Sequence, residues 1–270
     1  MLQRSLIIIF GLLFTNSVYA HEFWISPVNY EIGINKPFEA HFRIGQNFNG
    51  SSYSFLETNT KRHEVMQAGK IIKVSARNGD RPAFQLPGLP NGLAILVHET
   101  SNNVLKYTDF EKFINFVNHK SFQGLPQEHI SRGLPKIDFN ESYSRHAKSL
   151  VAIGDGAGKD VSVGLKIEII ALTNPYTDDL SNGMYVQVFM AGQPRTNVQV
   201  ELFERPINSR EGAQIKLYKT DAQGIAVFPV MVGHEYMLEN VALIPLEPKS
   251  EGDPVWHSLW ANLTFSVPKN

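Results

Sequence analysis

Hydrophobic and polar positions alternate along much of the chain after residue 20. In KPFEAHFRIGQNF the even-numbered positions from Phe38 to Ile44 are apolar, and the positions between them are polar. A period of two is typical of a strand with one buried face and one exposed face. KIIKVSA and LAILVHE are further predicted strands, separated by the turn-forming segments RNGDRP and PGLPNG. The pattern predicts a first β region from about His21 to Lys106.

The period changes between about residues 108 and 135. In TDFEKFINFVNHKSF the apolar positions follow the i, i+3, i+4, i+7 spacing of a helix face. Thr108 and Glu111 have the spacing of a capping box, which predicts a helix over about 109–119. LPQEHISRGLP predicts a second, shorter helix, with proline at its start and glycine and proline at its end. We therefore expect a small helical insertion between two β regions.

The segment TNPYTDDLSNG is dense in turn-forming residues and predicts a linker at 173–182. Six strand candidates joined by short turns follow it, namely MYVQVFM, NVQVELFE, QIKLYKT, IAVFPVM, YMLENVALI and SLWANLTFSV. Short alternating strands at this density are typical of an immunoglobulin-like or transthyretin-like sandwich. The predicted fold is mainly β, with two such β-sandwich regions, at 21–172 and 183–270, and the helical insertion lies in the first.

The first 20 residues have the pattern of a signal peptide. Arg4 precedes an apolar run from Leu6 to Phe14, and Val18-Tyr19-Ala20 fits the small-residue cleavage pattern. We expect cleavage after Ala20 and a mature, exported chain that begins at His21. No later window reaches the roughly 18 to 20 apolar residues that a transmembrane helix needs, so we expect no stable membrane insertion.

Charge and cysteine content narrow the classes of function. Loss of Arg4 leaves 24 of the 25 basic residues against 26 acidic residues, a mature net charge of −2. This balance does not predict binding to nucleic acid. Without cysteine, a metal site would use imidazole, carboxylate, amide oxygen or a terminal amine, and the chain has nine histidines.

His21 is the residue with the most distinctive chemistry. Once it is the first residue, its α-amine and its Nδ1 can bind one metal ion in a six-membered chelate ring. A second histidine would complete a three-nitrogen site suited to Cu(II) or Ni(II). The alternative is that HEFW simply begins an edge strand. The candidate partners are His119 and His129 in the helical insertion and His98 at the end of LAILVHE, with His146 as a weaker candidate that alternation places toward solvent.

The motifs of hydrolytic enzymes are missing from the sequence. Neither HExxH nor a G-x-S-x-G elbow occurs, so we predict no enzyme of those classes. Trp24, Trp256 and Trp260 could form a sugar-stacking surface, but their strand positions favour the core.

Five motifs resemble, in this order, an exported bacterial family called domain of unknown function 4198: AHEFWI, YSRHAKSLVAIGDG, IEIIALTNPYTDDL, TDAQGIAVFPV and WHSLWANLTFSVP. This family is often labelled a nickel- or cobalt-uptake-associated periplasmic protein. The resemblance implies a periplasmic β-sandwich that handles divalent Ni, Co or Cu, with a metal transporter or an outer-membrane receptor as its partner. Two alternatives stay open: a structural or adhesion-type sandwich without metal, and a copper oxidase that uses an N-terminal histidine brace on polysaccharide.

Overall fold

The computed structural model describes residues 21–209 and 211–269. The predicted signal peptide lies outside the described residues. One long sheet dominates the molecule and contains ten strands. Eight of them follow one path, in the order β15 (Gln214–Lys219), β14 (Gln199–Pro206), β17 (His234–Pro245), β18 (Pro254–Val267), β10 (Phe139–Ile153), β8 (Gly92–Thr100), β5 (Thr60–Gln67) and β6 (Lys70–Lys73). β2 (Glu31–Ile32) and β9 (Asn103–Tyr107) also pair with β10.

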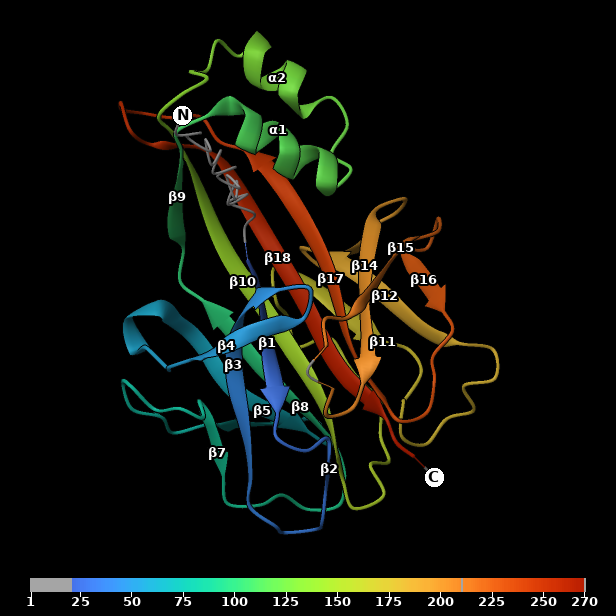
Figure 1. Ribbon diagram of the computed structural model, residues 1–270. Coiled ribbons are helices and arrows are strands. Elements are labelled where there is room, and N and C mark those ends of the chain that lie inside the picture. The colour runs from blue at the N-terminus through green and yellow to red at the C-terminus, as the bar shows by residue number, and fades with distance from the viewer. Residues whose placement is uncertain (1–20, 210, 270) are drawn as a thin grey trace, which may run out of the picture.

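Two smaller sheets pack against this long sheet, one on each half (Figure 1). The first consists of β1 (Glu22–Pro27), β3 (Phe38–Gln46), β4 (Asn49–Tyr53) and β7 (Phe84–Leu86). The second consists of β11 (Ile167–Ala171), β12 (Met184–Met190), β13 (Gln193–Pro194) and β16 (Ile225–Phe228). A separate buried cluster of apolar side chains fills each of the two interfaces. The predicted fold class, mainly β with two sandwich regions, is therefore confirmed.

The central strands β10 and β18 are the longest and run parallel to each other. Both faces of these strands are covered, and almost every position along them is buried. The predicted linker at 173–182 connects β11 and β12, which are antiparallel neighbours in one sheet. The two sandwich regions thus share the long sheet.

The helical insertion lies at one end of the long sheet (Figure 1) and contains α1 (Phe110–His119) and α2 (Leu125–Ser131). A 3₁₀ turn, η1 (Glu57–Asn59), is the remaining helical element of the described residues. Asp109, rather than the expected Thr108, is the N-cap of α1, because its side chain accepts from the backbone N–H of Glu111. Aromatic side chains on α1 pack on Trp256 and Trp260 of β18, which confirms that these tryptophans belong to the core. None of the helices in the described part of the chain has the length and apolar character needed to cross a bilayer.

Candidate functional site

A cavity of about 260 Å³ lies between the first small sheet and the long sheet. Its walls come from β1, β3, β4, β8, β9, β10 and β18, together with the turn around η1. Alternation along β1 turns Phe23 into this cavity, while the neighbouring Trp24 packs on the opposite side with Phe48. About half of the lining residues are aromatic or aliphatic, and the histidine, acidic and basic side chains among the others are His21, His98, Glu141 and Arg145.

Two of the four predicted metal ligands, His21 and His98, line this same cavity. His21 directly precedes β1 and is exposed to solvent, so its side chain lies at the cavity mouth. His98 is 3% exposed and belongs to the wall, where its ring lies 4.1 Å from that of Phe42, measured between centroids. The fold therefore brings together two histidines that are 77 positions apart (98 − 21).

One ring nitrogen of His98 has no hydrogen-bond partner. Its Nδ1 is buried and bonds to no group of the described residues. Burial, with a smaller effect from His63, lowers the pKa of His98 well below its usual value, so the ring is neutral. A neutral imidazole nitrogen without a hydrogen bond can act as a metal ligand.

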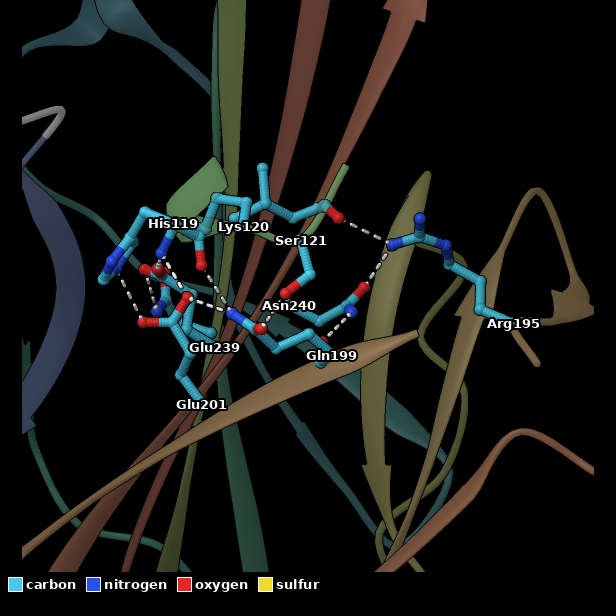
Figure 2. Close-up of polar contacts among 10 residues, drawn as sticks. His119, Lys120, Ser121, Arg195, Gln199, Glu201, Glu239 and Asn240 are labelled. Atoms are coloured by element: carbon cyan, nitrogen blue, oxygen red, sulfur yellow. Dashed lines mark hydrogen bonds and ion pairs between the residues drawn. The ribbon is translucent and has the colours of Figure 1, made fainter. Parts of the chain in front are cut away.

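His119 lies outside the cavity, at the end of α1. Its Nε2 is 3.3 Å from Oε2 of Glu201. The next residue, Lys120, is buried and contacts two carboxylates, with Nζ 2.5 Å from Oε1 of Glu201 and 2.6 Å from Oε1 of Glu239 (Figure 2). These contacts fasten the end of α1 to β14 and β17.

His129 is fully buried in the helical insertion. Its Nδ1 accepts from the indole N–H of Trp256 at 3.0 Å, and its Nε2 donates to the carbonyl oxygen of Pro135 at 2.9 Å. Both ring nitrogens are thus bonded within the protein. A metal ion at His129 would have to displace one of these two bonds.

Two functional candidates in the cavity, Glu141 and Arg145, were missed by the sequence reasoning. Both lie on β10, and both are buried. The expectation that His146 faces solvent was wrong, since it is 1% exposed. Alternation along NESYSRHAKSLV predicts one exposed face only when one side of the sheet meets water, whereas β10 is covered on both sides. The available signal was the density of ionisable residues in a strand otherwise rich in apolar positions.

Among residues 21–209 and 211–269, no group of three or more histidine, aspartate, glutamate or cysteine side chains is placed to hold a metal ion. The side chains of His21 and His98 alone would supply two imidazoles. A third nitrogen would have to be the terminal amine of His21.

The comparisons with known proteins give one family and a distant structural similarity. A search of curated proteins found no match. The D0-D1 domain of Intimin aligns with 90% of this chain and 97% of its own length, at 10% identity and a TM-score of 0.24. The model of the family described as Domain of unknown function (DUF4198) matches residues 18–242, and the chain therefore belongs to this family.

Proposed function

We propose that this protein binds a divalent transition metal, Ni, Co or Cu, through His21 and His98 in the periplasm. The observation that supports this most is the unpartnered Nδ1 of His98 in the wall of a cavity that His21 also lines. A buried imidazole nitrogen without a hydrogen bond is costly, and a ligand that completes it would recover that cost.

The neutral state of His98 supports the proposal. Metals bind imidazole only in its deprotonated form, so a group whose pKa is lowered by burial loses no affinity to protons near neutral pH. Imidazole and amine nitrogens favour late first-row metals over Mg²⁺ or Ca²⁺, and the absence of thiolates leaves nitrogen donors as the strongest available.

Cleavage after Ala20 would give the site its third nitrogen. In the uncut chain the nitrogen of His21 is an amide, which does not bind these metals at neutral pH in the same way as an amine. Cleavage during export would thus create the complete site only outside the cytoplasm. The function would then be capture of the metal for delivery to a transporter or an outer-membrane receptor.

The test is calorimetric titration of Ni(II), Co(II) and Cu(II) into protein that begins at His21. A matched protein with one additional alanine before His21 lacks the terminal chelate and should bind at least about tenfold more weakly, the loss of one ligand. One-to-one binding that is equal in both proteins would show that the amine is not a ligand.

A second pair of variants tests His98. His98→Gln should weaken binding, whereas His63→Gln should not. His63 is the right control because it is opposite His98 across β5 and β8, is also buried and also has an unpartnered Nδ1, but does not line the cavity. Equal metal binding by both variants and wild type would overturn the role of His98, and no binding by any of them would leave a sandwich without metal.

A further inference from the structure

The guanidinium of Arg145 is a buried cation without an ion-pair contact. Arg145 is 9% exposed and forms no ion pair within the described part of the chain, although the charges of Glu239 and Glu22 act on it from farther away. Arginine is seldom buried without such a pair, because removal of a charge from water is expensive. Its Nη1 is buried and has no hydrogen-bond partner, while the guanidinium bonds to the side chain of Tyr143.

Aromatic rings surround the guanidinium. Its central carbon lies 5.9 Å from the ring centroid of Phe23, 5.3 Å from that of Tyr143 and 5.5 Å from that of Trp260. These distances are within the range of cation–π attraction. Such contacts offset part of the desolvation cost of the charge, but they use the faces of the rings and leave N–H donors of the guanidinium unpaired. All three rings line the cavity.

The carboxyl group on the cavity wall does not pair with Arg145. Glu141 also lines the cavity, but each of its oxygens already accepts a hydrogen bond from within the protein. Oε2 accepts from the hydroxyl of Tyr107 at 2.9 Å, and Oε1 accepts from the hydroxyl of Ser258. The unpaired donors of Arg145 therefore remain available to a group that enters the cavity.

We propose that the cavity binds a small organic carboxylate, with its carboxyl group on Arg145 and its apolar body against the aromatic wall. Guanidinium and carboxylate have matching planar shapes and bond strongly where water is excluded. The volume of about 260 Å³ is far larger than an ion requires and suits a molecule of ring size. Phe23, Phe42 and Trp260 would contact the apolar part. This inference goes beyond metal binding and needs no metal.

The experiment is calorimetric titration in metal-free buffer with three carboxylates and their neutral amides: acetate and acetamide, hexanoate and hexanamide, phenylacetate and phenylacetamide. At least one of the two larger acids should bind one-to-one, and its amide should bind about 10- to 100-fold more weakly, as expected for loss of a charge-assisted hydrogen bond. Acetate should bind more weakly than either larger acid, because it lacks the apolar body. No binding by any acid, or equal binding of acid and amide, would overturn the proposal.

Two variants separate charge from geometry. Arg145→Met removes the cation but keeps an apolar chain among the rings, and it should abolish the preference for acid over amide. Arg145→Lys keeps a cation without the planar fork and should retain only part of that preference. The matched control is Arg132→Met: its guanidinium also lies over a ring, 5.0 Å from the centroid of Trp256, but outside the cavity. If the control loses carboxylate binding as fully as Arg145→Met, the site is not at Arg145.

The same proteins distinguish this proposal from metal binding. Metal titration is carried out without carboxylate and carboxylate titration without metal, so each binding is measured on its own. The acid–amide comparison on wild-type protein stands even if a variant fails to fold. Carboxylate binding without metal binding would overturn the proposed function and support this inference, and the reverse result would overturn this inference alone.

Discussion

The indole N–H of Trp256 donates a hydrogen bond to Nδ1 of His129 at 3.0 Å, and this bond joins the helical insertion to β18. His129 therefore acts as a structural link, although its position in the sequence equally suited a metal ligand. Substitution His129→Leu leaves the buried indole N–H and the carbonyl of Pro135 without partners. We expect a loss of about 3 kcal/mol in the free energy of unfolding, measured by urea denaturation, since each buried unsatisfied group costs about 1–3 kcal/mol.

Metal titration of the same variant checks the assignment. His129→Leu should bind Ni(II) with the wild-type affinity while it remains folded, because His129 does not line the cavity of His21 and His98. If the His129→Leu protein folds but does not bind Ni(II), His129 is a metal ligand after all.

Lys120 should be much more important for stability than an exposed lysine. Glu201 and Glu239 are directly opposite each other on β14 and β17, and Lys120 lies between their carboxylates (Figure 2). Burial lowers the pKa of Lys120, but these two carboxylates raise it by more, so the ammonium stays charged. Lys120→Met leaves two buried carboxylates facing each other. We expect a loss of about 3–5 kcal/mol in unfolding free energy, measured by chemical denaturation.

The matched control for Lys120 is Lys106→Met. Lys106 Nζ lies 2.9 Å from Oδ1 of Asp138 and so also forms a direct ion pair, but both side chains are more than half exposed. An exposed pair of this kind contributes less than about 1 kcal/mol. Similar losses for the two variants would mean that Lys120 is not the buried link between α1 and the sheet.

Local patterns predicted the elements well, while the environment of individual side chains depended on long-range pairing. The predicted helix at 109–119 and the strand candidates after residue 183 correspond to observed elements, because period and turn residues act over a few positions. That β10 is central could not be predicted locally, since it pairs with β18, more than 100 residues later. This pairing is what buries Glu141, Arg145 and His146, which a half-exposed strand would place partly in water.

The candidate site shows the same limit. His21 and His98 were identified by residue type, but β1 and β8 lie in different sheets, and only the packing of these sheets brings both side chains to one cavity. Arginine does not bind metal ions, so the sequence did not indicate Arg145 as a candidate site residue. Its significance comes from the lack of an ion pair to its buried guanidinium in the described residues, and that is a property of the fold.

Glu141 should make the protein less stable as pH rises. Burial raises the pKa of its carboxyl group from 4.5 to about 7, although the hydrogen bonds from Ser258 and Tyr107 oppose the shift. Between these two values the unfolded chain ionises while the folded protein keeps its proton, so stability falls as pH increases through this window. Glu141→Gln cannot ionise. We expect the variant to gain about 3 kcal/mol relative to wild type between pH 4.5 and pH 8, from 1.36 kcal/mol per pKa unit.

Urea denaturation of both proteins at pH 5, 6, 7 and 8 measures this difference. Well below pH 4.5, the carboxyl group is neutral in both states, and wild type and Glu141→Gln should differ only through their hydrogen bonds to Ser258 and Tyr107. A difference that stays constant from pH 5 to pH 8 would show that Glu141 has no raised pKa in the folded protein.

His146 should have the opposite pH dependence. Burial lowers the pKa of its imidazole from 6.5 to about 4, and a bond to the carbonyl of Trp260 opposes the shift. Above pH 6.5 the ring is neutral in both the folded and the unfolded state. Between pH 6.5 and pH 4 only the unfolded chain takes up the proton, so the free energy of unfolding decreases by up to about 3 kcal/mol as the pH is lowered. His146→Gln keeps a donor for the carbonyl of Trp260 but does not titrate. At pH 7.5 a difference in unfolding free energy between wild type and His146→Gln reports packing alone. When the pH is lowered from 7.5 to 4.5, the variant should lose less stability than wild type. If the two proteins instead lose stability in parallel over this range, His146 is not the neutral buried group described here.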